Sequence, residues 1–366
     1  MAKAKLFQLL AALCVVVLVA AACSDDSADA DGEVAPDGAE QVEIVQGSTL
    51  LAVQERGNLT CGVAGSAPGF SLAEEDGTVV GIDADYCRAV AAAVLGDANA
   101  VTFVAITEAE RFDAVRAGQI DVLMRNTAWT QSRDAVVGVD FGPTIFYDGQ
   151  QFMAREADGF SAGSTVEDIG DANVCTSAGT NQAAIIELAE DLGVSITVDT
   201  LEGFDSVTEQ FISGDCDIIT AGGSTLASSR AGQGPAGEGW VIFPSQPIGT
   251  APLGPVYGQN DSQWADVINW TVYASFILGD QYGVTADNLE SMETDGPPEV
   301  VRLLGGDGEL QSEMGLSLDA FFNVVDQVGT YDEIFDRNLN PIGLEREGSL
   351  NASWLDGGLI YAPPAR

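Results

Sequence analysis

The sequence predicts an α/β protein in which helices cover parallel sheets. Short apolar runs typical of buried strands alternate with helical segments between residues 59 and 243. After a Pro- and Gly-rich stretch, residues 262–366 are mainly helical. The chain has 366 residues, enough for two domains and a sizeable core.

The first half of the alternation contains a hairpin turn at Asp76-Gly77. Its predicted strands are residues 59–63, 101–106, 122–124 and 141–147. Its predicted helices are residues 81–94 and 110–117. Phe70 lies in a loop and is expected to be exposed.

The second half repeats the pattern and then changes to helices. Strands are predicted at 174–177, 196–201, 217–220 and 240–243, and helices at 182–192 and 206–212. Residues 244–255 are rich in Pro and Gly and are interpreted as a crossing between the two domains. The last predicted helices are 264–278, 298–304 and 318–331.

Residues 121–147 contain the strongest local signal of a binding site. A short apolar strand is followed by the polar residues Arg125 and Asn126, and Thr130 is placed to cap a helix that carries Arg133. Ligands of open α/β sheets bind at the carboxyl ends of strands. A guanidinium group can hold a carboxylate through two parallel hydrogen bonds. By itself, Arg133 has the ordinary alternative of a surface ion pair.

A second candidate anion site follows the strand at residues 174–177. There a Gly-Thr turn precedes a helix, so backbone N–H groups near Thr180 and Asn181 are available to an anion. A plain helix cap has the same sequence pattern.

Composition excludes several functional classes. The chain has no histidine, which removes Ser-His-Asp catalysis and histidine metal sites. Its formal net charge of −42 argues against nucleic acid as a partner. We predict no catalytic residue, no metal and no cofactor. The many acidic side chains repel one another in dilute buffer. Because salt screens this repulsion, salt is expected to stabilise the fold.

The first residues predict export. Lys3 and Lys5 precede an apolar run that ends in small residues before Cys23. This ending resembles the bacterial lipobox, which implies a signal peptide at 1–22, cleavage before Cys23 and lipid on its sulfur. An ordinary signal peptide or an uncut anchor are the alternatives. Residues 23–48 are acidic, have little apolar content and are expected to form a solvated tether.

Four cysteines remain after the leader: Cys61, Cys87, Cys175 and Cys216. In an exported protein they suggest two disulfides, for which the sequence allows three pairings. A metal site is the alternative, although no Cys-x-x-Cys spacing occurs.

Long segments of the sequence after the tether resemble family 3 solute-binding proteins, which serve ABC transporters of polar amino acids. Within this family, they are most similar to the general L-amino-acid branch. The segments include GIDADYCRAVAAAV, ERFDAVRAGQIDVLMRNTAWTQSRD, FYDGQQFM and GGLIYAPPAR. The resemblance implies a type II periplasmic binding protein fold with two lobes that close on a ligand by hinge bending. Residues 49–147 and 252–366 would form lobe 1, and residues 148–251 lobe 2, with two crossings between them.

The same resemblance assigns candidate ligand-binding residues. Arg133 matches the arginine that clamps the α-carboxylate of the ligand. The other matching positions are Asn126 and Ala128 after the strand, Thr180 and Asn181 at the helix start in lobe 2, and the loop aromatic Phe70. We also expect the disulfides to stay within a lobe, as Cys61–Cys87 and Cys175–Cys216.

Gly222 departs from the family pattern. The family usually has an aspartate there that pairs with the α-ammonium of the ligand. An unpaired buried ammonium costs several kcal/mol, so another acid is expected to substitute, and Glu108 is the candidate by position. Otherwise the ligand is a carboxylate other than an amino acid.

The expected function is therefore capture of amino acids for an ABC importer by an extracytoplasmic lipoprotein. Its expected partners are a small-molecule ligand and the permease subunits, with contact to the membrane only through the lipid, and the protein is expected to be a monomer. The alternatives are a binder of another small carboxylate, or an enzyme similar to the dehydratases that share this fold. Because neither histidine nor a lysine beyond Lys5 is present to act as an acid or base, we expect no enzyme.

Overall fold

The computed structural model describes residues 48–178, 180–193 and 196–366, all within one compact unit that spans residues 44–366. The predicted signal peptide, the lipidation site Cys23 and nearly all of the predicted tether lie outside the described residues. In the described ranges, no helix combines the length and apolar character that crossing a membrane requires.

The first sheet has the strand order β5-β1-β6-β13-β7. Strands β5 (Val101–Ala105), β1 (Leu59–Val63) and β6 (Val122–Leu123) are parallel, so their carboxyl ends lie at one edge. Strand β13 (Val256–Gly258) returns late in the chain and pairs antiparallel with β6 and with β7 (Val139–Phe141). The helices around this sheet are α1 (Ser48–Arg56), α2 (Ile82–Leu95), α3 (Arg111–Arg116) and α4 (Gln131–Val136).

The second sheet has the order β10-β9-β11-β8-β12. Its parallel strands are β10 (Val198–Leu201), β9 (Val174–Ser177) and β11 (Ile218–Gly222). Its helices are α5 (Thr180–Leu192), α6 (Phe204–Ser213) and α7 (Gly223–Gly232). The sequence analysis missed α7, because a run of Gly and Ser gives no apolar periodicity.

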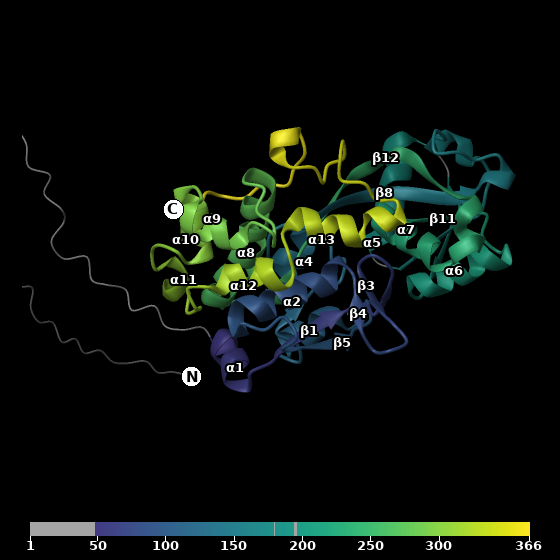
Figure 1. Cartoon of the computed structure of the whole chain (residues 1–366). Coiled ribbons are helices and arrows are strands. Elements are labelled where there is room, and N and C mark those ends of the chain that lie inside the picture. The colour runs from purple at the N-terminus through teal and green to yellow at the C-terminus, as the bar shows by residue number, and fades with distance from the viewer. Residues whose placement is uncertain (1–47, 179, 194–195) are drawn as a thin grey trace, which may run out of the picture. The chain divides into compact units, whose positions relative to one another are not determined.

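Two long antiparallel strands make the crossings. Strand β8 (Phe146–Arg155) pairs with β12 (Trp240–Leu253) from Trp240↔Arg155 to Leu253↔Phe146, with two register shifts. Both strands can be followed in Figure 1. The prediction of one strand at residues 141–147 was wrong: β7 ends at Phe141, and Pro143, which has no N–H to donate, lies between β7 and β8.

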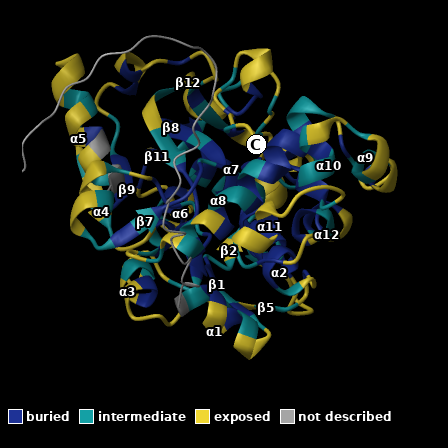
Figure 2. Ribbon diagram, turned by 90° about the vertical axis from the view of Figure 1, so that its left-hand side faces the viewer, coloured by how far each residue is buried: buried dark blue, intermediate teal, exposed yellow. Residues whose placement is uncertain are grey.

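The C-terminal region is helical, as predicted. Helix α8 (Ser262–Phe276) packs with α2 in the main hydrophobic core. Buried residues of strands and of inner helices together form this core (Figure 2). The predicted helix 318–331 is two helices, because Gly329 has φ +105° and Thr330 starts a new helix through a capping box. The remaining helices are α9 (Leu289–Asp295), α10 (Pro298–Leu304), α11 (Leu310–Glu313), α12 (Ala320–Gln327) and α13 (Tyr331–Asn338). A small sheet of β2 (Ser66–Ala67), β3 (Ser71–Ala73) and β4 (Val79–Val80) contains the predicted hairpin.

Both predicted disulfides are confirmed. Cys61 on β1 is joined to Cys87 on α2, with a Cα–Cα distance of 6.0 Å. Cys175 on β9 is joined to Cys216, just before β11, with a Cα–Cα distance of 5.9 Å. Each bridge therefore links a strand to a neighbouring segment of the same sheet region, and all four sulfur atoms are in the core.

Candidate anion-binding site

The candidate site lies where the parallel strands β5, β1 and β6 end. The loop after β5 carries Glu108 and leads to Arg111, the first residue of α3. The segment after β6 carries Arg125 and Asn126, and the next helix, α4, carries Arg133. Because β5 and β6 are both neighbours of β1, residues far apart in the sequence meet at this edge.

Arg133 is held by its own helix and by the segment before it. The Thr130 side chain caps α4 by accepting a hydrogen bond from the Arg133 backbone N–H at 3.3 Å, as predicted. The Arg133 Nη1 atom donates to the Ala128 carbonyl oxygen at 2.7 Å, and its guanidinium lies 5.4 Å from the centre of the Phe112 ring. Burial lowers the pKa of Arg133. A partly buried, oriented guanidinium is suited to an anionic ligand.

Arg111 and Arg125 complete a group of three arginines that the sequence analysis did not recognise. Arg111 lies over the same Phe112 ring at 5.0 Å, and its Nε atom is buried without a hydrogen-bond partner among the described residues. Burial, followed by repulsion from Arg133 and Arg125, lowers the pKa of Arg111 to about 9. The Arg125 Nε atom donates to the Ile106 carbonyl oxygen at 2.7 Å, and burial lowers its pKa too. We refer to Arg111, Arg125 and Arg133 as the arginine cluster.

Glu108 lies beside the arginine cluster. Its Oε1 atom is 4.0 Å from Arg125 Nη1, and its side chain is 40% exposed. Its charge acts to raise the pKa of all three arginines. Since Glu108 faces guanidinium groups, its predicted role as the partner of a ligand ammonium stays a prediction.

Asn126 and Ala128 lie on the segment between β6 and α4. Asn126 has φ +34°, and its backbone N–H donates to Asp83 Oδ2 at 3.3 Å. Asp83 is 2% exposed, at the start of α2, and burial raises its pKa to about 7. Ala128 is buried and forms an isolated bridge to Leu253 of β12. A buried carboxyl group and a crossing strand thus support the segment that carries these two residues.

The expectation that Phe70 is exposed was wrong. The ring is 1% exposed and packs edge-on against Phe146, with centroids 5.6 Å apart. The loop residues around it form part of the small β2-β3-β4 sheet, so the aromatic side chain points into the core. In this conformation Phe70 supports the start of β8.

At Gly222 the expected gap in negative charge is filled from another strand. A Cβ atom at this position would lie 2.3 Å from Asp148 Oδ2. Asp148 is on β8, and its carboxylate accepts hydrogen bonds from the Ser224 Oγ atom at 2.5 Å and the Ser224 N–H at 3.1 Å. Burial raises the pKa of Asp148, while these hydrogen bonds and those of Gly149 and Gly223 oppose the rise. The acid therefore comes from β8 and caps the start of α7.

The second predicted anion site is described only through its backbone. Helix α5 begins at Thr180, earlier than the predicted start at residue 182, so Thr180 and Asn181 belong to the helix and not to the turn before it. The side chains of Thr180 and Asn181 lie outside the described residues.

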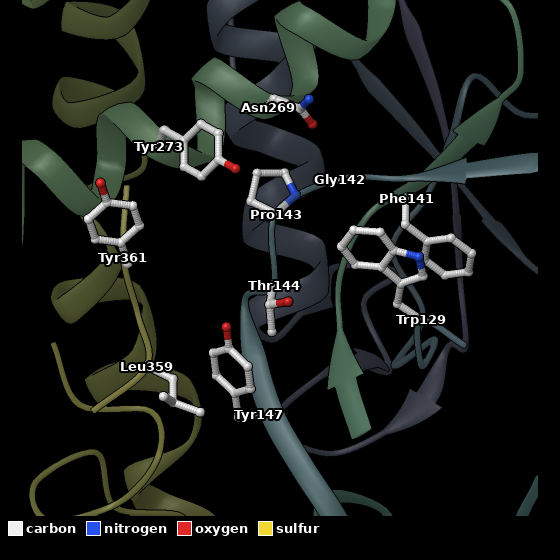
Figure 3. A pocket seen from close by; sticks show the side chains of 10 residues that line it. All are labelled: Trp129, Phe141, Gly142, Pro143, Thr144, Tyr147, Asn269, Tyr273, Leu359 and Tyr361. Carbon is white, nitrogen blue, oxygen red and sulfur yellow. The ribbon is translucent and has the colours of Figure 1, made fainter. Parts of the chain in front are cut away.

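A separate cavity of about 360 Å³ lies beside the start of β8. Figure 3 shows its aromatic lining, in which the Trp129 and Phe141 rings stack at 5.9 Å. Tyr147, Tyr273 and Tyr361 add hydroxyl groups, and no charged side chain lines it. None of the residues predicted to bind the ligand lines this cavity.

Comparison with known proteins gives the family. Residues 59–171 match the family described as bacterial extracellular solute-binding proteins, family 3. The chain is 37% identical over 324 residues to the glutamate/glutamine/aspartate/asparagine-binding protein of Rhodobacter capsulatus, covering 87% of this chain and 94% of that protein. It is 36% identical over 325 residues to the general L-amino acid-binding periplasmic protein of Rhizobium johnstonii, covering 87% of this chain and 93% of that protein.

A solved structure agrees over nearly its whole length. The periplasmic binding protein of an ABC transporter from Brucella ovis, with glutathione bound, is 35% identical and has a TM-score of 0.82. The match covers 87% of this chain and 99% of the Brucella protein. The fold is the type II periplasmic binding protein fold, with β8 and β12 as its two crossings. The chain belongs to family 3 of the bacterial extracellular solute-binding proteins.

Proposed function

We propose that this protein captures amino acids outside the cytoplasm and delivers them to the permease of an ABC importer. The observation that carries the proposal is the placement of Arg133 at the carboxyl ends of parallel strands, oriented through Ala128 and the Phe112 ring. Relatives that cover most of this chain are amino-acid-binding proteins. Arg133 would bind the α-carboxylate of the ligand, and Asn126 and Ala128 would contact it from the same segment.

The two sheets would belong to lobes that close on the ligand by hinge bending. Residues 49–147 and 252–366 would form lobe 1 and residues 148–251 lobe 2, joined by β8 and β12. The start of α5, with Thr180 and Asn181, would approach the same carboxylate when the lobes close. Phe70 would contact the ligand only through a change in its present packing, because its ring is buried.

The ligand ammonium would be compensated by Asp148 rather than by a residue at position 222. The Asp148 carboxylate occupies the space beside Gly222 and is held there by Ser224. Glu108 is the other candidate, but it lies among guanidinium groups, which attract its charge. Asp148→Asn and Glu108→Gln separate the two candidates. Neutralising the true partner should weaken the binding of an amino acid more than the binding of its deaminated analogue.

The leader supports attachment to the membrane surface. We propose cleavage of residues 1–22, lipid on Cys23 and a tether formed by residues 23–48. The protein would act as a monomer and bind its ligand without turnover. Mass spectrometry of the membrane fraction would detect lipid on the first cysteine, and NMR of a bound amino acid would detect any conversion.

The test is titration calorimetry with a panel of L-amino acids. Arg133→Ala should weaken the best ligand at least tenfold, since a hydrogen bond to a charged group contributes roughly 1.5–3 kcal/mol. Arg302→Ala removes an arginine of α10, outside the arginine cluster, and is the matched control that should keep the affinity. An unchanged affinity in Arg133→Ala, or a wild-type protein that binds no amino acid, would contradict the proposal.

A further inference from the structure

We infer that Asn351 is a positioning residue for the closing of the lobes, because it fixes the lobe 1 end of the crossing strand β8 and so confines the bend to the residues that follow. The inference rests on the proposed function, in which the two lobes close on a ligand by hinge bending. It gives a role to the C-terminal segment, residues 331–353, to which the proposed function assigns none.

The first argument is a pair of hydrogen bonds between Asn351 and Tyr147 of β8. The Tyr147 backbone N–H donates to Asn351 Oδ1 at 2.6 Å, and Asn351 Nδ2 donates to the Tyr147 carbonyl oxygen at 3.1 Å. Asn351 is only 5% exposed, although it lies 204 residues further along the chain. A side-chain amide offers a donor and an acceptor as a peptide group does, so Asn351 takes the place of a neighbouring strand.

The second argument is that the neighbouring strands leave this place open. On one side, β11 pairs with β8 no closer than Gln150 and so ends before it reaches Tyr147. On the other side, Tyr147 lies opposite Pro252 of β12, which has no N–H, and the Pro252 carbonyl accepts from the Trp129 N–H at 2.8 Å. Removing the Asn351 side chain would therefore leave both backbone groups of Tyr147 without these partners.

The third argument is a second anchor at the start of the same strand. The hydroxyl of the fully buried Tyr331 donates to the Ile145 carbonyl oxygen, just before β8, at 2.9 Å. Arg346 connects the two anchors, because its guanidinium lies 4.8 Å from the centre of the Tyr331 ring and its Nε atom donates to the Asn351 carbonyl oxygen at 3.2 Å. Arg346 is itself paired with the buried Asp280. The start of β8 is thus fastened at two points to one segment.

The fourth argument is the place where the pairing of the crossing strands becomes irregular. The pairing of β8 with β12 is regular up to Asp148 and again from Phe152 onward, but two register shifts separate these stretches. Gly249 of β12 lies in the second shift and has φ +70°, a conformation that favours glycine. Strands bend where the ladder is interrupted. The bend of β8 therefore falls at residues 149–151, just beyond the anchored Tyr147.

The distance between the lobes in ligand-free protein tests the inference. Cysteines introduced at the exposed Glu190 of α5 and the exposed Glu313 of α11 would carry one nitroxide label in each lobe. Pulsed electron paramagnetic resonance then measures the distribution of distances between the two labels. Because no amino acid is added, the result does not depend on which ligand the protein binds.

Two substitutions of Asn351 should broaden this distribution relative to the wild type. Asn351→Ala removes both hydrogen bonds to Tyr147, so the bend can extend back along β8. Asn351→Asp has nearly the same shape, but a carboxylate cannot donate to the Tyr147 carbonyl oxygen and should also broaden the distribution. Tyr331→Phe removes only the hydrogen bond to Ile145 and should broaden it less.

The matched control is Gln311→Ala. Gln311 is 1% exposed, and its Nε2 atom donates to the carbonyl oxygens of Arg302 and Leu303, both at 2.8 Å. The substitution therefore also removes a buried amide with two hydrogen bonds to the backbone, but none of them reaches β8. Its distance distribution should equal that of the wild type. Circular dichroism and melting temperature establish that each variant is folded.

The possible outcomes separate this inference from the proposed function. Distributions in Asn351→Ala and Asn351→Asp as narrow as that of the wild type overturn the inference. An equal broadening in Gln311→Ala also overturns it, because the change would then report lost stability and not a lost anchor. If Asn351→Ala does not fold, Asn351→Asp and Tyr331→Phe provide the same test. The proposed function fails separately, when calorimetry finds no amino acid that binds to the wild type.

Discussion

The arginine cluster and the buried carboxylate of Asp148 carry opposite charges, and they differ in how many of their polar atoms have partners in the protein. Asp148 accepts hydrogen bonds from the side chain and backbone of Ser224, and it fills the space beside Gly222. Arg111, in the arginine cluster, keeps a buried Nε atom without an acceptor among the described residues. The Asp148 carboxylate is therefore held by donors of its own chain even without a ligand, while the Arg111 Nε atom lacks an acceptor.

The difference teaches how a charge that also stabilises the ligand-free fold can be told from one that does not. A charge whose partners all come from its own chain holds elements together, here β8 and the start of α7. A charge that is oriented but not compensated stores a cost that a ligand can relieve. Removing the first kind should destabilise the protein, and removing the second should stabilise the ligand-free state.

A change of pH between 4.5 and 7.5 has the largest expected effect, because buried carboxyl groups titrate in this range while the arginines stay charged. Burial raises the pKa of Asp83 to about 7, from about 3.8 in the unfolded chain. Between these values the folded state holds the extra proton, so its stability is greatest at low pH and falls as pH rises to 7, by up to about 4 kcal/mol. The raised pKa of Asp148 acts with the same sign.

Urea unfolding between pH 4.5 and 7.5 measures this slope. Asp83→Asn keeps an oxygen that can accept from the Asn126 N–H, yet it cannot ionise, so its slope should be shallower than that of the wild type. Equal slopes in the two proteins would show that the Asp83 carboxyl does not titrate in this range.

Asp148→Ala tests whether the hydrogen bonds between Asp148 and Ser224 stabilise the fold. The substitution leaves buried donors of Ser224 without their acceptor and should lower the unfolding free energy by about 3 kcal/mol. Gly222→Ala should also destabilise the wild type, because its Cβ would meet Asp148 Oδ2, but should cost little in the Asp148→Ala background. Additive effects of the two substitutions would contradict this packing.

Arg111→Leu tests the arginine cluster and has the smallest expected effect on stability. Without ligand, it removes a buried charge that faces two other guanidiniums, so it should stabilise the protein by about 1 kcal/mol. Thermal unfolding of ligand-free protein measures the change, with Arg116→Leu, outside the arginine cluster, as the control. A loss of stability in Arg111→Leu would mean that Arg111 is a structural charge after all.

The features that depend on residues close together in the sequence were predicted correctly in most cases. The alternation of strands and helices, the Thr130 cap of α4 and both disulfides are present as expected. Arg133 was a candidate because it lies on the first helix after a strand end and because its segment resembles the family motif. The break between β7 and β8 was missed, although Pro143 is a visible signal for it.

The rest of the site depends on pairing between distant segments. The strand order β5-β1-β6 brings Arg111 beside Arg125, and that order is not the order of the sequence. Asp148 reaches Gly222 because β8 pairs antiparallel with β11 in the register Gly222↔Gln150. Neither neighbour relation leaves a mark in the residues themselves, so a single sequence does not contain these two parts of the site in readable form.

The order of the disulfides has a consequence for how the chain matures. Cys61 pairs with Cys87, 26 residues later, and Cys175 with Cys216, 41 residues later. Each of these cysteines is joined to its neighbour along the chain, and the two loops do not overlap. A polypeptide that emerges with its N-terminus first exposes the complete first pair before any thiol of the second. Oxidation in order of emergence therefore gives the native connectivity for these four cysteines, without a slow exchange between wrong bridges.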